Sequence, residues 1–371
     1  MKKVLIVHPD LSGGGAEKVL VNVLNEIDYE KYKITLLLEH KSGVYIGDIN
    51  KNVNIKYIHD PCRYRNTFLK KLYCKIMMIL FEDMPRILHK LIVGNKYDIE
   101  IAFLEGESTK FISSSGNKKS IKIAWNHTDV SKYSLERIRK EEQYYENIDN
   151  IILVSNNAKK SFDKTYPQYS HKSSVIYNLI NESEIIEKSD EFLVEKDEYI
   201  YIVAVGRLIE EKRFDILLKA YKSLLSEGIK VKLLIVGSGK LEKKLKKLIV
   251  ELQISDSVEM IGFTKNPYPY IKSADIFVST SDFEGFSLVL CEAMILEKPI
   301  IATKSEGALE ILDYGKYGML VEKDNYNELK DCLKKVIVNN SLLNELKDKS
   351  RVRSKEFYKN NSINKINELF L

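Results

Sequence analysis

The sequence predicts an α/β fold made of two doubly wound parallel-sheet domains that face a central cleft. Short, continuous apolar runs alternate with helical segments along both halves of the chain, which is typical of buried parallel strands joined by crossover helices. The chain has 371 residues, more than one hydrophobic core usually serves, and 44% of them are hydrophobic, which is enough for two sizeable cores.

The expected strands are the short apolar segments of this pattern. In the first half they are residues 4–7, 34–38, 53–58, 98–103, 121–125 and 151–155. In the second half they are residues 199–205, 231–236, 258–261, 274–279, 298–302 and 317–321. Between the two halves, residues 182–196 are charged and loosely patterned, as in a linker or a peripheral helix.

The composition limits the classes of partner. A net charge of +5 suits small anionic ligands or an anionic membrane surface, and it is too weak and dispersed to argue for nucleic acid. The four cysteines form no Cys-x-x-Cys pair and no zinc-ligand spacing, which favours a reducing, cytoplasmic compartment. The N-terminal residues predict a first strand rather than a signal peptide, and no apolar run reaches transmembrane length.

A glycine-rich loop follows the first strand and leads into a helix that begins near Ala16. Gly14 and Gly15 lie at the expected helix N-terminus, which suits close approach to phosphate. The glycines are contiguous, so the Gly-x-Gly-x-x-Gly spacing of a dinucleotide fingerprint is absent. A plain flexible loop between strand and helix is the alternative.

Residues 63–80 predict a basic amphipathic helix. Its lysines lie off the apolar face, which consists of Leu69, Leu72, Tyr73, Ile76 and Leu80. An ordinary helix that covers a sheet and has a solvated basic face is the favoured interpretation. A helix that lies on an anionic membrane surface is the alternative.

His127 and the pair Arg207 and Lys212 each follow an expected strand, at the edge where ligands of parallel sheets bind. His127 could instead belong to a helix-capping turn with its neighbours. An arginine offers phosphate a fork of donors and a lysine a point charge, so Arg207 and Lys212 suit a diphosphate. The alternative is a surface ion-pair cluster with Glu210 and Glu211.

The stretch from residue 279 to residue 294 carries two carboxylates, Glu284 and Glu292, eight positions apart. Glu284 falls in the loop after an apolar strand, and Glu292 falls inside an apolar helix, where a carboxylate is costly unless it is paired. A ligand with hydroxyl and phosphate groups fits this setting, with a diol on Glu292 and phosphate on the backbone amides of residues 286–288. A partly exposed helix glutamate and a first-turn glutamate favoured by the helix dipole are the alternatives.

Three of these motifs resemble the GT4-type retaining glycosyltransferases (glycosyl transferases group 1), which have the GT-B fold of two Rossmann-like domains. They are Glu-x7-Glu at residues 284–292, Gly-Arg-Leu…Glu-Lys at 206–212 and Ser-Gly-Gly-Gly-Ala-Glu-Lys at 12–18. The resemblance covers nearly the whole chain. It implies an acceptor-binding domain over residues 1–180, a nucleotide-sugar-binding domain over 181–350, and a C-terminal helix over 351–371 that packs back on the first domain. Residues 175–181 resemble the family's end-of-domain strand and hinge, near Asn178.

The resemblance also assigns roles to single residues. It implies catalytic roles for His127, Arg207, Lys212 and Glu284, with His127 and Glu284 orienting the transferred sugar. It implies donor binding by a larger set of residues, several of which act through the backbone: Gly14, Gly15, Arg207, Lys212, Gly237, Phe263, Glu284, Gly285, Phe286, Ser287, Leu288 and Glu292.

The expected function is that of a retaining, metal-independent hexosyl- or N-acetylhexosaminyltransferase that uses no cofactor. The donor would be a nucleotide-diphosphate sugar, with UDP as the expected nucleotide, and the acceptor a glycan or polyprenyl-linked oligosaccharide in bacterial surface polysaccharide biosynthesis. We expect a cytoplasmic protein, peripheral on the inner face of the membrane.

Two positions depart from the family pattern. Glu306 replaces one of a usual pair of glycines, which weakens any phosphate contact in that loop, and Arg213 stands where glycine is frequent, for which we expect little effect. A catalytically silent partner subunit that stabilises another transferase is the alternative function, although the intact set of charged residues argues against it. A GT-B epimerase or phosphorylase is a further alternative, and a phosphorylase would need a pyridoxal lysine and a longer chain.

Overall fold

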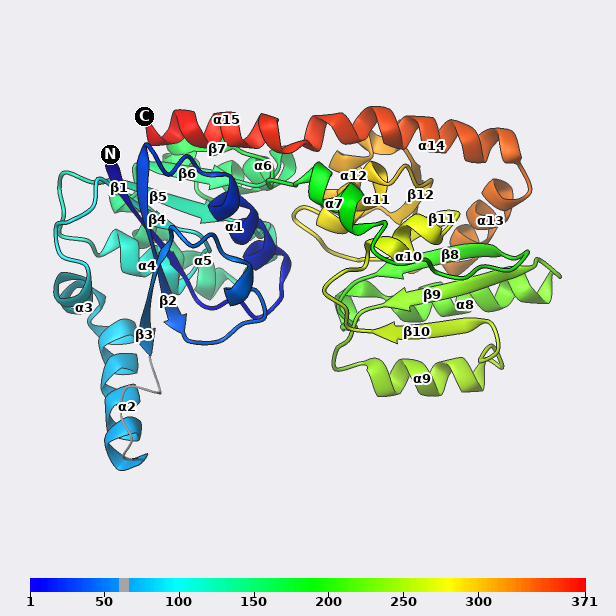
Figure 1. Ribbon diagram of the computed structural model, residues 1–371, viewed down its shortest axis with the longest axis horizontal. Helices are drawn as coiled ribbons and strands as arrows, with labels where there is room; N and C mark the ends of the chain where they lie inside the picture. The colour runs from blue at the N-terminus through cyan, green and yellow to red at the C-terminus, as the bar shows by residue number, and fades with distance from the viewer. Residues whose placement is uncertain (60–66) are drawn as a thin grey trace. The chain divides into compact units, whose positions relative to one another are not determined.

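The computed structural model describes residues 1–59 and 67–371, and it divides the chain into two compact units (Figure 1). The first unit comprises Met1–Leu179 and Ser362–Leu371, and the second comprises Ile180–Asn361. The chain therefore leaves the first unit after residue 179 and returns to it inside the last helix.

The first unit contains a seven-stranded parallel sheet in the order β3-β2-β1-β4-β5-β6-β7. Its strands are β1 Lys2–His8, β2 Tyr32–His40, β3 Asn54–His59, β4 Ile99–Ala102, β5 Ile121–Asn126, β6 Asn150–Leu153 and β7 Ser173–Val175. Its helices are α1 Gly15–Glu26, α2 Thr67–Asp83, α3 Pro85–Ile92, α4 Glu107–Ser113, α5 Leu135–Glu142, α6 Asn156–Thr165 and the end of α15 Lys359–Phe370.

The second unit contains a six-stranded parallel sheet in the order β10-β9-β8-β11-β12-β13. Its strands are β8 Ile200–Val205, β9 Val231–Val236, β10 Val258–Gly262, β11 Ile276–Ser279, β12 Ile300–Thr303 and β13 Met319–Val321. Its helices are α7 Glu182–Lys188, α8 Phe214–Ser226, α9 Glu242–Glu251, α10 Tyr268–Ser273, α11 Leu288–Ile295, α12 Glu306–Ile311, α13 Tyr326–Ile337 and α14 Asn340–Ser354.

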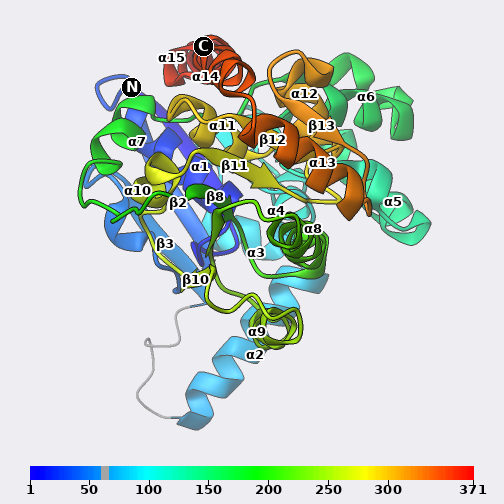
Figure 2. The ribbon, with the colours of Figure 1, turned by 90° about the vertical axis from the view of Figure 1, so that its right-hand side faces the viewer.

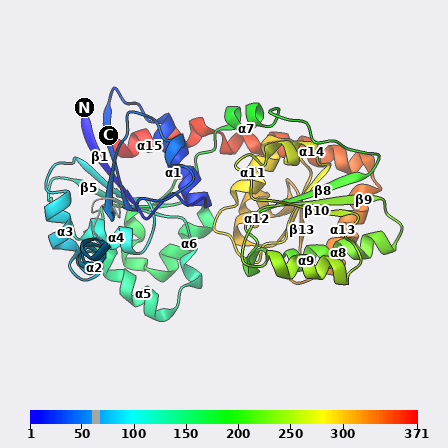
Figure 3. The ribbon, with the colours of Figure 1, turned by 60° about the horizontal axis from the view of Figure 1, so that its bottom comes forward.

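Each sheet is covered by helices on both faces. In the second unit, α8 and α9 lie on one face and α11 and α14 on the other (Figure 3). This arrangement explains the uniformly apolar strands, since β4 and β12 are buried along their whole length. The predicted α/β class with two doubly wound parallel sheets is confirmed.

Three expectations from the sequence need correction. The strand expected to begin at Val175 ends there instead, because residues 173–175 pair with β6 and the following residues leave the sheet. The helix expected over 63–80 is described from Thr67 and extends to Asp83, while residues 63–66 lie outside the described residues. Its apolar face does not simply cover the sheet, since Leu72 and Ile76 are each nearly half exposed.

The order of strands reverses once in each sheet, between β1 and β4 in the first unit and between β8 and β11 in the second. Crossover helices leave these neighbouring strands on opposite sides, so the loops at their carboxyl ends diverge and leave room for a ligand. The two reversal points therefore locate the candidate site within each unit. His8 ends β1 at the first reversal point, and the loop carrying Arg207 follows β8 at the second.

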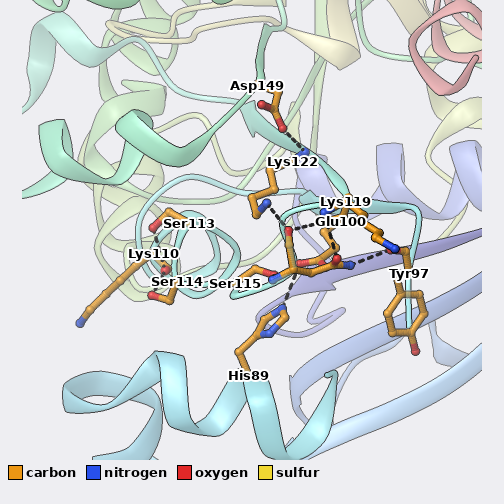
Figure 4. A network of polar contacts seen from close by, with 12 residues as sticks. His89, Tyr97, Glu100, Lys110, Ser113, Ser114, Ser115, Lys119, Lys122 and Asp149 are labelled. Atoms are coloured by element: carbon orange, nitrogen blue, oxygen red, sulfur yellow. Dashed lines mark hydrogen bonds and ion pairs between the residues drawn. The ribbon is translucent and has the colours of Figure 1, made fainter. Parts of the chain in front are cut away.

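A buried polar network anchors α3 at the opposite, amino-terminal edge of the first sheet (Figure 4). The Nε2 atom of His89 lies 2.9 Å from Oε2 of Glu100, and Asn117 donates a 3.2 Å hydrogen bond to the other oxygen of that carboxylate. Lys122 donates to the carbonyl of Asn117 at 2.7 Å. Burial raises the pKa of Glu100, but hydrogen bonds from His89 and from nearby serines outweigh it, so the pKa is lowered overall.

We predict that Glu100→Ala destabilises the first unit by about 3 kcal/mol, because it leaves the imidazole of His89 and the amide of Asn117 buried without their acceptor. Thermal unfolding should show the corresponding transition shifted down by roughly 10 °C. Glu136→Ala is the matched control, since Glu136 is an exposed glutamate on α5 of the same unit.

The contribution of Glu100 also has a defined pH dependence. Because its folded-state pKa is lowered, the stabilisation is fully present above the ordinary pKa of a glutamate and is lost as the pH falls through the lowered value. The difference in midpoint between wild type and Glu100→Ala should therefore shrink on acidification. Equal midpoints for the Glu100 and Glu136 variants at neutral pH would show that the network does not stabilise the fold.

Candidate functional site

The centre of the candidate site in the second unit is an ion pair between Lys212 and Glu284. The ammonium of Lys212 contacts Oε1 of Glu284, and the two side chains are only 20% and 10% exposed. Ser281 donates a second hydrogen bond to the same carboxylate oxygen at 3.0 Å. The two residues come from the loops after β8 and β11, the neighbouring strands at the reversal point.

Hydrogen bonds to the backbone fasten these two loops together. The amide of Asp282 donates to the carbonyl of Glu211 at 2.8 Å, and the hydroxyl of Thr280 donates to the carbonyl of Lys212 at 2.8 Å. On the other side, Thr303 at the end of β12 donates to the carbonyl of Ser281 at 2.6 Å. The position of Glu284 is therefore determined by neighbouring strands on both sides.

Gly307 completes this support, and the structure explains why glycine is retained there. Its amide donates to the carbonyl of Glu284 at 2.8 Å. A Cβ atom at position 307 would lie 3.0 Å from that oxygen and 3.3 Å from the backbone of Phe286 and Ser287. Gly307 thus allows α12 to pack against the Glu284 loop, which is a structural role.

Lys212 lies in an environment that disfavours its charge. Burial lowers its pKa to about 8, and the nearby guanidinium of Arg207 contributes to the lowering. The charge of Glu211 opposes this shift. Lys212 is thus charged at neutral pH but loses its proton more readily than an ordinary lysine.

Arg207 and Arg213 are close in sequence but differ in their partners. Arg207 is exposed, and its guanidinium forms no hydrogen bond or ion pair with the described parts of the chain. It does not form the surface cluster considered as its alternative role, because Glu210 pairs with Lys240 at 2.7 Å. Arg207 therefore remains available to an anion.

Arg213, by contrast, is fully engaged by carboxylates. It adopts the left-handed conformation (φ 48°, ψ 41°), which explains why glycine suits this position. Its guanidinium pairs with Asp215 at 3.1 Å, with Asp282 at 3.0 Å and with Asp324. These contacts join the start of α8 to the Glu284 loop, a structural role that the sequence did not indicate.

The N-terminus of α11 offers backbone donors beside Glu284. Ser287 is the N-cap residue, yet its hydroxyl makes no capping bond and is buried without a partner among the described residues. The first N–H groups of a helix, here those that begin at Leu288, lack intrahelical acceptors and favour an anion. Phe286 is buried and packs edge-on against Phe357.

Glu292 lies one turn further along α11 and is buried, as the sequence indicated. The hydroxyl of Tyr268 donates to its Oε1 at 3.1 Å, which satisfies part of the need of this carboxylate for partners. Tyr268 was not singled out from the sequence. Its role depends on α10 lying beside α11, and nothing local in the sequence indicates that.

Gly237 and Phe263 occupy the loops after β9 and β10. Gly237 has φ 140°, and a Cβ atom there would lie 2.0 Å from the carbonyl of Gly206, so only glycine fits. Gly239 likewise lies against the backbone of Leu208. Phe263 follows Gly262 and is 53% exposed. The glycines allow the loops after β8 and β9 to pack together, which is a sufficient structural reason for them.

In the first unit, His127 lies just beyond β5 and is positioned by Glu105. The carboxylate of Glu105 accepts from the amide of His127 at 2.9 Å and also from the hydroxyl of Thr128. The side chain of Asp129 caps the following helical turn. His127 therefore does not have the helix-capping role that was its alternative interpretation. Nε2 of His127 is buried without a partner in the described chain, and burial together with His8 lowers its pKa to about 3.

Gly14 and Gly15 form the entry to α1, as expected. Gly14 is the N-cap residue, where it has no side chain to cap the helix, and Gly15 is the first helical residue. Gly13 requires its glycine, with φ 110°. The glycine loop and His127 thus belong to the first unit, whereas Arg207, Lys212, Glu284, the residues 285–288 and Glu292 belong to the second.

Two residues at the carboxyl edge of the first sheet were missed. His8 ends β1 and is buried, and Glu39 lies near the end of β2. Burial and the charges of Glu107, Asp10 and Glu82 raise the pKa of Glu39 to about 7. Because these side chains come from separate segments that meet only in the fold, no local pattern could have identified them.

The acidic, histidine and cysteine side chains show no metal-binding arrangement in residues 1–59 and 67–371: no three of them are grouped so that they could hold an ion. The groups that can bind an anion in the second unit are Arg207, Lys212 and the N-terminus of α11. This set suits phosphate, and Glu284 and Glu292 add acceptors suited to hydroxyl groups.

Comparison with known proteins agrees with this chemistry. Residues 185–353 match the family model described as glycosyl transferases group 1. An N-acetylgalactosaminyltransferase of Campylobacter jejuni that acts on N-acetylgalactosamine-N,N'-diacetylbacillosaminyl-diphospho-undecaprenol is 28% identical over 97% of this chain and 96% of its own length. An uncharacterized glycosyltransferase of Haemophilus influenzae is 29% identical over 93% of both chains.

Among solved structures, the Anabaena protein HepE in complex with UDP and glucose has the same fold. It superposes with a TM-score of 0.80 over 100% of this chain and 99% of its own, at 18% sequence identity. Residues 185–353 therefore match the glycosyl transferases group 1 family, and the chain is a glycosyltransferase of the GT-B fold.

Proposed function

We propose that this glycosyltransferase moves a sugar from a UDP-sugar to a lipid-linked glycan in bacterial surface polysaccharide or glycan biosynthesis. We further propose that it retains the anomeric configuration and needs no metal ion. The observation that carries the proposal is the largely buried Lys212–Glu284 pair, held beside the N-terminus of α11 and beside an arginine whose guanidinium has no partner in the described chain.

The charges of this set match the needs of a departing nucleoside diphosphate. When the bond between the anomeric carbon and the phosphate oxygen breaks, negative charge develops on the diphosphate. Lys212, Arg207 and the first amides of α11 supply positive charge and hydrogen-bond donors there, which stabilises the transition state more than the ground state. This is the role a divalent cation has in metal-dependent transferases.

The carboxylates support binding of the uncharged parts of the donor. Glu292 would accept hydrogen bonds from the ribose diol, and Tyr268 holds this carboxylate in place at 3.1 Å. Glu284 would contact the transferred sugar, with Lys212 and Ser281 fixing its orientation. The family resemblance supports a further role for His127 in binding the transferred sugar, and backbone contacts of Gly14, Gly15, Gly237 and Phe263 with the nucleotide-sugar.

In this proposal the anomeric configuration is retained because the acceptor attacks on the same face that the leaving group departs from. The family resemblance supports this mechanism. The acceptor oxygen bonds to the anomeric carbon on the face that the diphosphate leaves. The acceptor proton passes to the departing phosphate oxygen, so the diphosphate itself acts as the base. The choice of UDP and of a lipid-linked acceptor rests on the relatives, one of which acts on a diphospho-undecaprenol glycan and one of which binds UDP.

We predict that UDP raises the thermal unfolding midpoint of the wild-type chain and that Lys212→Ala largely abolishes this shift. Transfer from a UDP-sugar should fall by about a hundredfold in kcat for Lys212→Ala, because the leaving group loses a preorganised cation. Glu284→Ala should also lower kcat. Lys246→Ala is the matched control, since Lys246 is an exposed lysine in the same unit.

Two further measurements test the finer parts of the proposal. Turnover should be unchanged after treatment with EDTA, and the product of an α-linked donor should carry an α linkage by NMR. Wild-type turnover by Lys212→Ala would refute the proposed role of this residue. A chain that binds no nucleotide and only raises the activity of another transferase would be the silent partner instead.

We predict that donor binding weakens as the pH rises through about 8. The lowered pKa of Lys212 means that its ammonium is present below this value and is lost above it. Calorimetric titration with UDP should show a severalfold loss of affinity between about pH 7 and pH 9. Lys212→Arg is the control, because a guanidinium stays charged over this range and should remove the dependence.

The helices α2 and α3 of the first unit support a contact with an anionic membrane surface. Helix α2 projects from the sheet (Figures 1 and 2), and the segment from α2 to α3 exposes a series of large apolar side chains, 42–72% each. These residues are Leu72, Ile76, Met78, Ile79, Met84, Ile87 and Leu91. Lys75, Arg86 and Lys90 are exposed on the same two helices. This combination suits the boundary between acyl chains and anionic head groups.

None of the helices in the described ranges is long and apolar enough to cross a bilayer. We predict that the full chain sediments with vesicles rich in phosphatidylglycerol and that the double variant Ile76→Asp, Ile79→Asp reduces binding more than tenfold. Val250→Asp is the matched control, because Val250 is 66% exposed on α9 of the second unit. Equal binding by the double variant, or equal binding to neutral vesicles, would contradict the proposed contact.

A further inference from the structure

We propose that Nε2 of His8 accepts a hydrogen bond from a sugar hydroxyl group, which makes His8 a substrate-binding residue at the carboxyl edge of the first sheet. This inference rests on the proposed function, since it needs a sugar substrate. It goes beyond the family pattern, which draws attention to His127 and to the glycine loop but not to the residue that ends β1.

His8 lies at the carboxyl edge of the first sheet. It is the last residue of β1, at the reversal point next to β4, and it is 1% exposed. Its ring centroid lies 6.4 Å from that of Phe103, and the ring of His127 lies 5.1 Å from the same phenylalanine. Phe103 in turn packs against Trp125 at 4.8 Å. Two histidines thus share one aromatic surface at the edge where ligands of such sheets bind.

The hydrogen bond made by Nδ1 of His8 determines whether Nε2 is a donor or an acceptor. Nδ1 of His8 lies 2.7 Å from the carbonyl oxygen of Asp10. Because a carbonyl only accepts, Nδ1 carries the hydrogen and donates it. Burial lowers the pKa of His8 to about 4, although Asp10 opposes the shift, so the ring is neutral at physiological pH. Nε2 therefore presents a lone pair and acts as an acceptor.

This acceptor is buried and has no partner among the residues that the structure describes. Leaving a buried polar atom unsatisfied is costly, so such an atom calls for an explanation. Nε2 of His127 and Oδ1 of Asn126, from the end of β5 and the loop after it, are also buried without partners. Several buried polar atoms without hydrogen-bond partners therefore lie at the carboxyl edge of the first sheet. A ligand rich in hydroxyl groups would supply these partners.

A pair of variants separates the two ring nitrogens. His8→Asn keeps an N–H that can donate to Asp10 but has no atom at the position of Nε2. His8→Gln can place its amide oxygen near that position and so keeps an acceptor. We expect kcat/KM for transfer to fall at least tenfold in His8→Asn and to stay within about threefold of wild type in His8→Gln.

The hydroxyl group could belong to the donor sugar or to the acceptor. Measuring hydrolysis of the UDP-sugar in the absence of acceptor distinguishes the two. A donor hydroxyl on His8 would lower hydrolysis and transfer together in His8→Asn. An acceptor hydroxyl would leave hydrolysis unchanged and raise only the KM for the acceptor. Stabilisation by UDP should be unchanged in both variants, because the residues proposed to hold the diphosphate and the ribose, Arg207, Lys212 and Glu292, lie in the second unit.

Two outcomes would overturn the inference. Wild-type kinetics in His8→Asn would show that no substrate group uses Nε2. An equal loss of activity in His8→Gln and His8→Asn, with lowered unfolding midpoints, would make His8 a structural residue. A wild-type chain that neither binds UDP nor transfers sugar would instead refute the proposed function, and this result is distinguishable from the other two.

Discussion

The contact between the Lys212 ammonium and the Glu284 carboxylate is the interaction on which the second unit's site depends. Both charges are largely withdrawn from water, which is tolerable only because each has its partner and because Ser281 adds a hydrogen bond. The surrounding loops hold the two side chains in place. The change in strand order makes β8 and β11 neighbours, and Gly307 allows α12 to approach the carbonyl of Glu284. A rigid pair of this kind can bind a ligand without first being reordered.

Arg207 and Arg213 differ in whether the guanidinium already has a partner. Arg213 has three carboxylate partners and holds loops together, while Arg207, in the same loop, has none within the described chain. The same contrast holds between the two edges of the first sheet. At the amino-terminal edge His89 is satisfied by Glu100, whereas at the carboxyl edge Nε2 of His8 and of His127 lack partners. Fold stability explains the satisfied groups, and ligand binding is the role that we propose for the others.

The chemistry that follows from this arrangement is largely electrostatic. Neither histidine at the carboxyl edge of the first sheet carries a charge at neutral pH, because burial lowers both pKa values well below 6.5. Positive charge is concentrated in the second unit, at Lys212, Arg207 and the start of α11. A division of this kind suits a reaction in which one partner is a polyanionic leaving group and the others are neutral hydroxyl groups.

The sequence by itself determined the class of fold and the other strands of both sheets, although it misplaced β7, and it placed the phosphate-binding candidates after strands, because continuous apolar runs and glycine positions are local signals. It also identified Glu284 and Glu292 by their spacing. Only the tertiary structure decided that Arg213 joins three loops, that Tyr268 holds Glu292, and that His8 lies near His127. These relations connect residues far apart in the chain, and packing between elements, which no local pattern records, brings them together.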